Sequence, residues 1–237
     1  MLVRIRHPEK LIYPETDGQP MGENTIQVRW IITLFNGLEA LVRDRHDVFV
    51  ASNLFWYPVH GDPTYCLAPD VMVAFGPRKG DRPSYKQWEE GRVAPQVVVE
   101  ILSPSNTIDE RVGKLKFYRR NGCEEYYEYD PYGHKLRVWA RNGKTFAPVK
   151  DVNGFVSPRL GVRFVVPGTE PMTVVGPDGR PFRTYLDLVA EAEAQQERLA
   201  EESKRADGER KRAESERTRA DAFAARLREL GIDPDTV

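Results

Sequence analysis

The sequence predicts an α/β domain followed by a long C-terminal helix, and three segments carry this prediction. Apolar residues recur at spacings of three and four over residues 24–45, which indicates an amphipathic helix. The run from Val97 to Leu102 is almost continuously apolar and β-branched, which is typical of a strand buried on both faces. Residues 185–230 are rich in Ala, Glu and Arg and contain no proline, so they predict one long helix.

Shorter elements are predicted between these helices. A second helix is predicted over residues 108–121, because Gly122 offers a C-terminal stop. Glycine and proline interrupt residues 76–95, which predict a mobile loop or lid, and residues 167–181 are expected to form turns. Short apolar or aromatic runs between turn residues predict strands at 48–50, 54–57, 71–75, 96–102, 126–129 and 136–140, with further β segments over 155–166.

These elements divide the 237-residue chain into three parts. Residues 1–22 are expected to be irregular, residues 23–181 to form the α/β domain, and residues 182–237 to form the long helix. The formal net charge is −1, so any contact with nucleic acid would depend on a local basic patch.

The composition argues against several classes of protein. Cys66 and Cys123 are far apart in sequence, and the four histidines show no metal-ligand spacing, so neither a zinc site nor a disulfide framework is expected. We therefore expect a cytoplasmic protein with reduced thiols. No apolar stretch has the length of a signal peptide or of a membrane span, and neither is expected.

The long C-terminal helix has one apolar seam. Tyr185, Leu199 and Leu227 belong to a series that recurs every seven residues, with alanine at the positions between them. The second seam that a coiled coil needs begins at Val189 but continues with polar residues. Two interpretations stay open: a solvated helix supported by ion pairs between residues four apart, and a weak coiled coil that forms a homodimer.

Two carboxylates occupy positions where apolar side chains are expected. Glu100 lies inside a buried strand, on the same face as Val98 and Leu102. Asp70 opens the apolar strand over 71–75, so the two acids lie at comparable places on two strands. An unpaired buried carboxylate is costly, and a cation such as Mg²⁺ or Mn²⁺ is one way to compensate for it. The alternative is that Asp70 caps a turn and Glu100 pairs with an arginine or a lysine.

The helix predicted over 108–121 adds cationic groups. Lys114 and Tyr118 are four residues apart and share one face, whereas Lys116 lies at the flank of the apolar stripe. The alternative is an ordinary amphipathic helix with solvated lysines. Basic residues that a phosphate backbone would contact occur on this helix and on the preceding loop: Arg111, Lys114, Lys116, Arg119 and Arg120, and Arg78, Lys79, Arg82 and Lys86.

A longer motif joins these residues over positions 20–165. Pro69-Asp70 opens one strand, and Val99-Glu100-Ile101-Leu102-Ser103-Pro104-Ser105 follows about thirty residues later. The motif continues with Asp109, Lys114, Tyr118, Gly122, Glu125-Tyr126 and Asp130-Pro131. This string resembles the Uma-two family of restriction endonucleases, within the PD-(D/E)xK nuclease superfamily. The resemblance implies a restriction-endonuclease-like fold, in which helices flank a mixed central sheet.

The same resemblance implies a site. Asp70 and Glu100 would bind Mg²⁺ or Mn²⁺, with help from the backbone carbonyl of Ile101. The superfamily lysine would follow Glu100 by two residues, but Leu102 stands there, and the family's lysine in the following helix matches Lys114. The remaining candidates are Lys116 as the alternative lysine, Glu23 on the first helix, Ser103 after the strand, and Tyr118.

The function implied by the resemblance is hydrolysis of phosphodiester bonds in DNA by a metal-dependent endonuclease. A second hypothesis belongs to another class of protein. In it the nuclease fold has lost its chemistry, and the C-terminal helix supplies the function by dimerising or by binding a partner.

Overall fold

The computed structural model of the chain describes residues 11–16, 24–231 and 233. The chain divides into two units, residues 1–184 and residues 185–237. Among the described residues, the strands and two helices belong to the first unit, and one long helix belongs to the second.

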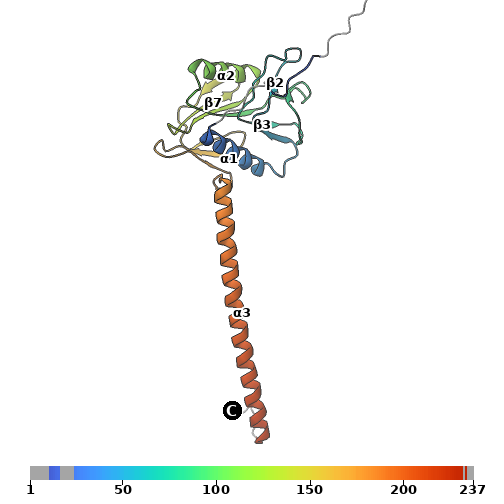
Figure 1. Cartoon of the computed structure of the whole chain (residues 1–237), viewed down its shortest axis with the longest axis vertical. Coiled ribbons are helices and arrows are strands. Elements are labelled where there is room, and N and C mark those ends of the chain that lie inside the picture. The colour runs from blue at the N-terminus through green and yellow to red at the C-terminus, as the bar shows by residue number, and fades with distance from the viewer. Residues whose placement is uncertain (1–10, 17–23, 232, 234–237) are drawn as a thin grey trace, which may run out of the picture. The chain divides into compact units, whose positions relative to one another are not determined.

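A six-stranded mixed sheet organises the first unit (Figure 1). Neighbouring strands run antiparallel except β5 and β6, which are parallel and are joined by helix α2, Ile108–Asn121. The strand order is β1 (Val48–Ala51), β3 (Val71–Phe75), β5 (Val97–Ile101), β6 (Glu125–Asp130), β7 (Lys135–Asn142) and β8 (Thr145–Pro148). The predicted mixed central sheet is thus confirmed.

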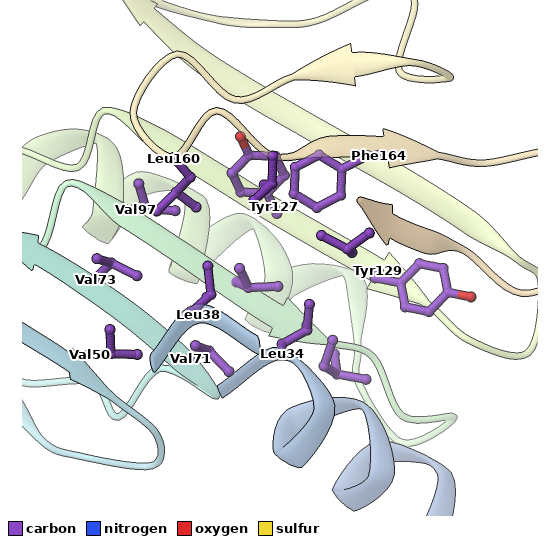
Figure 2. Close-up of a cluster of buried hydrophobic side chains, with 14 of the residues drawn as sticks. Leu34, Leu38, Val50, Val71, Val73, Val97, Tyr127, Tyr129, Leu160 and Phe164 are labelled. Carbon is purple, nitrogen blue, oxygen red and sulfur yellow. The ribbon is translucent and has the colours of Figure 1, made fainter. Parts of the chain in front are cut away.

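Helix α1, Thr25–Leu41, covers one face of this sheet. Its first turn is capped by Asn24, whose side-chain oxygen accepts a hydrogen bond from the Gln27 amide at 2.9 Å. Leu34 and Leu38 face the sheet residues Val71, Val73 and Val97 (Figure 2). The predicted period of three and four therefore matches the buried stripe of α1.

A small antiparallel sheet extends the same core. It consists of β9 (Phe155–Val156), β10 (Arg163–Val165) and β11 (Thr173–Val175). Phe164 of β10 stacks on Tyr127 of the central sheet, with ring centroids 4.6 Å apart (Figure 2). Strand β11 corrects the expectation that residues 167–181 form only turns. Its three residues are too few to show a period in the sequence.

Helix α2 covers the opposite face of the central sheet (Figure 1). Its aromatic residues pack beside β2 (Trp56–Tyr57), and the Trp56 and Tyr118 rings stack at 6.2 Å. Strand β2 pairs in parallel with β4 (Tyr85–Lys86), whose tyrosine is fully buried. The segment 76–95 is therefore anchored by β4, which corrects the expectation of a loop throughout. Strand β4 has only two residues and lies between glycines and prolines. No alternation of apolar and polar residues can therefore be recognised there in the sequence.

The second unit contains α3, Tyr185–Glu229, in which no described residue is buried. The predicted long C-terminal helix is confirmed. Over the described parts of the chain, no helix combines the length and the apolarity that crossing a membrane requires.

Candidate active site

Strand alternation and register bring the two predicted carboxylates together. On β5, Val97, Val99 and Ile101 face α1, so Glu100 faces α2. Val71 pairs with Val99 across the antiparallel β3–β5 ladder. Continuing this register by one residue sets Asp70 directly opposite Glu100. Residues directly opposite each other on antiparallel strands have Cβ atoms about 4.5–5.5 Å apart.

Asp70 is tied to the end of β5. The residue is buried, with 8% of its surface exposed, and Oδ2 accepts a hydrogen bond of 2.6 Å from the Ile101 backbone amide. The side chain thereby extends the β3–β5 ladder beyond the last paired residues. Because a charged acceptor strengthens this bond, it fixes Asp70 beside Glu100.

Glu100 is held by two groups from α2. Its side chain is almost fully buried, and Oε2 accepts a hydrogen bond of 2.7 Å from Lys114 Nζ. The Tyr118 hydroxyl donates to the other oxygen, Oε1. Lys114 and Tyr118 lie one helical turn apart, so the predicted shared face is the one that meets the carboxylate.

The charges around Lys114 keep it protonated. Burial alone would lower its pKa, but the Glu100 carboxylate, the hydrogen bond to it and the charge of Asp70 together raise the pKa above the ordinary lysine value. Burial and the charge of Glu100 also raise the pKa of Tyr118 well above its ordinary value. Lys114 therefore remains positively charged, and both Asp70 and Glu100 stabilise that charge. Tyr118 remains neutral and acts as a hydrogen-bond donor.

A third buried carboxylate, Glu128, lies beside Glu100 and was not predicted. The parallel β5–β6 register pairs Glu100 with Glu128, and the antiparallel β6–β7 register pairs Glu128 with Arg137. Arg111 Nε and Arg137 Nη1 donate to Glu128 at 3.0 and 2.9 Å. Burial first, and the nearby charge of Glu100, raise the pKa of Glu128, although Arg111 opposes the shift. A polar row thus crosses the α2 face of the sheet.

Gln27 of α1 is a second residue that the sequence did not single out. Its side-chain amide donates to the backbone carbonyl of Ile101 at 2.9 Å. This carbonyl is the one predicted to help bind a metal. The predicted Glu23, four residues earlier in the sequence, is outside the described residues.

The other predicted site residues lie apart from the carboxylate pair. Ser103 belongs to the turn after β5, where its amide donates to Asn106 Oδ1 at 2.8 Å and its hydroxyl lies 2.7 Å from that of Ser105. Lys116 is exposed on α2.

Several of the predicted DNA-contacting residues form ion pairs within the protein. The pairs are Lys79 with Glu39, Arg82 with Glu90, Lys86 with Glu89, and Arg111 with Glu128.

A cleft of about 550 Å³ adjoins the carboxylate pair. Lys114, Lys116 and Arg120 of α2 form one wall, and residues 64–67 form the other. Lys114 belongs both to this cleft and to the contact with Glu100. A ligand in the cleft would therefore meet the candidate active site at Lys114.

The oxygen groups at the site are two carboxylates and one backbone carbonyl. Within the described residues, no cluster of three or more His, Cys, Asp or Glu side chains is arranged to hold a metal ion. Any cation here would accordingly depend on Asp70, Glu100 and the carbonyl of Ile101.

Comparison with known proteins places these residues in a family. The family model Uma2, described as "Putative restriction endonuclease", matches residues 12–163. The chain belongs to the Uma2 family. The matched region contains Asp70, Glu100, Lys114 and Tyr118, and the predicted resemblance is confirmed. Membership in the Uma2 family indicates a nuclease.

One solved structure with a similar fold is the crystal structure of a putative nuclease belonging to DUF820 from Anabaena variabilis ATCC 29413. It is 16% identical, with a TM-score of 0.44, and the alignment covers 61% of this Uma2 chain and 79% of that chain. Among curated proteins, none matches this chain.

Proposed function

We propose that the chain is a metal-dependent endonuclease that hydrolyses phosphodiester bonds in DNA, using Asp70 and Glu100 to bind Mg²⁺ or Mn²⁺. The observation that carries the proposal is the convergence of Asp70, Glu100 and Lys114 at the ends of β3 and β5. Membership in a restriction-endonuclease family supports the substrate class.

The groups present fit such a cation. Carboxylate and carbonyl oxygens are the ligands that Mg²⁺ and Mn²⁺ prefer, and Asp70, Glu100 and Ile101 supply them. These oxygens carry more than one lone pair, so the hydrogen bonds from Lys114, Tyr118 and Gln27 are compatible with metal binding. When bound, the cation would supply Lewis-acid activation of water and offset the charge of the phosphate.

The protein's own residues would prepare this site. Tyr118 and Lys114 each hold one oxygen of Glu100, which fixes the orientation of that carboxylate. Lys114 keeps its proton, so we assign it to orienting the attacking water and to offsetting the charge that develops on the phosphate. Because it is already paired and positioned before substrate arrives, its charge needs little reorganisation during the reaction.

The deciding experiment compares Glu100→Ala with the wild-type chain. Both would be incubated with plasmid, linear, single-stranded and branched DNA, and with RNA, in Mg²⁺, in Mn²⁺ and in excess chelator. We expect cleavage by the wild type that the chelator abolishes, and a loss of about 10²-fold or more in Glu100→Ala, on the scale of losing a key electrostatic group.

Glu125→Gln is the matched control for this experiment. Glu125 is as buried as Glu100 but lies at the start of β6, away from Glu128 and the carboxylate pair. It accepts hydrogen bonds from the hydroxyls of Tyr127 and Ser157 and from the backbone amide of Arg159. This control should retain metal-dependent cleavage if it remains folded by circular dichroism. Equal metal-dependent cleavage by the wild type and Glu100→Ala would contradict the assignment of Glu100.

The second candidate function is that of an interaction protein. The observation that favours it is α3, a 45-residue helix without a buried described residue, on which Leu188, Leu199 and Phe223 are exposed. In that case α3 would bind a second copy of the chain or a different partner. Absence of cleavage of every nucleic acid tested would favour this reading over the nuclease.

A further inference from the structure

The cleft beside α2 has charged side chains that are mainly positive, in contrast to the neighbouring carboxylate pair. Three cationic side chains, Lys114, Lys116 and Arg120, line it together with a single carboxylate, Glu110. Glu110 already accepts a hydrogen bond of 2.8 Å from the Thr107 backbone amide. The cleft is therefore electropositive and suits an anionic ligand.

The cationic residues of the cleft lie on two sides of the surface that α2 presents to it. Lys116 and Arg120 are four residues apart, so they follow one another on the same side of α2. Both are exposed. Lys114 is two residues before Lys116 and so lies on the other side, where it contacts Glu100. A chain of phosphates that crosses the cleft from Lys116 and Arg120 to Lys114 would lead to the carboxylate pair.

The opposite wall of the cleft carries an aromatic ring. Tyr65 is half-buried, its ring lies 4.9 Å from that of Phe117, and its hydroxyl accepts a hydrogen bond of 2.9 Å from Asn121. These two contacts hold the ring in place beside the cleft. A fixed aromatic ring beside several cationic side chains is the combination that binds single-stranded nucleic acid, by stacking bases and pairing phosphates.

Gly113 supports a close approach of the ligand to the helix. It lies inside α2 and lines the cleft, and a Cβ atom added there would meet nothing within 4 Å. A glycine inside a helix is destabilising relative to alanine, and no packing contact requires this one. Its effect is to leave the helix backbone open to the cleft.

We infer that the cleft between α2 and residues 64–67 binds one strand of single-stranded DNA and directs it to the carboxylate pair. This inference rests on the proposed nuclease function and names its substrate class. In a duplex the bases stack on one another inside the helix, whereas a single strand leaves them free to stack on an aromatic ring. The cleft places Tyr65 and the cations of α2 together, so a single strand can use both.

The test measures binding separately from cleavage. Fluorescence anisotropy of a labelled oligonucleotide and of its duplex would be recorded with the full-length chain in chelator, over a series of salt concentrations. We expect the single strand to bind more tightly than the duplex. In Lys116→Ala/Arg120→Ala, the slope of log affinity against log salt should decrease by about 1.4, since each phosphate contact on a single strand contributes about 0.7.

Two matched controls accompany these variants. Arg119→Ala removes an exposed cation from the same helix that does not line the cleft, and the salt slope should not change. Tyr65→Leu should weaken single-strand binding by about tenfold through lost stacking, whereas Tyr65→Phe keeps the ring and should bind as the wild type does. Circular dichroism of each variant confirms that α2 is retained.

The outcomes separate this inference from the proposed function. Equal slopes for the cleft variant and Arg119→Ala, or tighter binding of the duplex, would overturn the inference even if metal-dependent cleavage is observed. Binding with the expected slopes would support the cleft assignment even if no cleavage is found.

Discussion

Charge compensation at individual residues stabilises the polar row on the α2 face of the sheet. Glu100 is bound by Lys114 from the helix, and Glu128 is bound by Arg111 from the same helix and Arg137 from β7. A buried carboxylate without such partners would cost several kcal/mol. The charge of Asp70, as well as that of Glu100, raises the pKa of Lys114 against the effect of burial.

Replacement of Lys114 tests its assigned role. Lys114→Ala should lower kcat for metal-dependent cleavage by about 10²–10³-fold, because a fixed positive charge is removed from the site of the developing negative charge. Lys116→Ala, two residues along, should keep kcat and raise KM, since Lys116 lines the cleft without contacting Glu100. Steady-state kinetics on a cleavable substrate measure both values. A larger loss of kcat in Lys116→Ala would show that Lys116 is the lysine of the site.

The candidate site could be predicted in part from single residues. A charge inside an apolar strand identified Glu100, and an acid at the start of another identified Asp70. Glu128 is also a charged residue inside a buried strand. Its neighbours in the sequence are tyrosines, which have polar groups of their own, so the charge of Glu128 does not stand out as unusual. Gln27 could not be predicted, because its partner, the Ile101 carbonyl, is 74 residues away.

At the level of elements, α2 is positioned by its N-terminal cap. Thr107 and Glu110 form a reciprocal capping box, in which the Glu110 carboxylate accepts from the Thr107 amide and the Thr107 hydroxyl accepts from the Glu110 amide. Gly122 ends the helix in the left-handed conformation. Both ends are therefore fixed by local sequence, and α2 begins and ends where predicted.

The capping box makes stability depend on pH. The hydrogen bond from the Thr107 amide is the main cause that lowers the pKa of Glu110 in the folded state. A lowered folded pKa stabilises the fold above the unfolded pKa, and this stabilisation is lost as pH falls through the folded value. The difference in unfolding free energy between wild type and Glu110→Gln should be present at neutral pH and shrink below about pH 4.3.

Urea denaturation over a range of pH measures this difference. Asn24→Ala, which removes the cap of α1, is the reference variant, because an amide does not titrate in this range and its loss should cost about 1 kcal/mol at every pH. A difference for Glu110→Gln that stays constant down to acid pH would contradict the role of the ionised carboxylate.

Three short strands were not predicted from the sequence: β4, β8 and β11, which contain two, four and three residues. None is long enough for alternation to be recognised. Strand β4 pairs with β2, which is distant in the chain, whereas β8 and β11 pair with the strands that precede them, β7 and β10. The long strands and helices were recognisable because their periods extend over many residues.

At the scale of the whole molecule, α3 carries a charge pattern that supports a helix without a partner. Its arginines and glutamates alternate at steps of four and three, which are the spacings at which side chains meet on a helix. The series is Arg198, Glu202, Arg205, Glu209, Arg212, Glu216 and Arg219. Its glutamates occupy positions beside the alanine seam where a coiled coil needs apolar residues.

Pairing of two such helices would therefore place like charges together. In a parallel pair, the glutamates at 202, 209 and 216 would meet their own copies beside the seam, which is unfavourable. We expect both the full chain and a variant ending at Thr184 to be monomers, so that sedimentation equilibrium of the full chain gives a mass near 27.1 kDa.

The contribution of α3 to the helical ellipticity measured by circular dichroism should also depend on salt. Ion pairs on an exposed helix are screened, so the ellipticity lost on deleting residues 185–237 should be smaller at high salt than at low salt. A coiled coil would instead gain helicity with protein concentration. A full chain of twice the monomer mass, together with a monomeric variant ending at Thr184, would show that α3 pairs with a second copy, as the interaction-protein hypothesis requires.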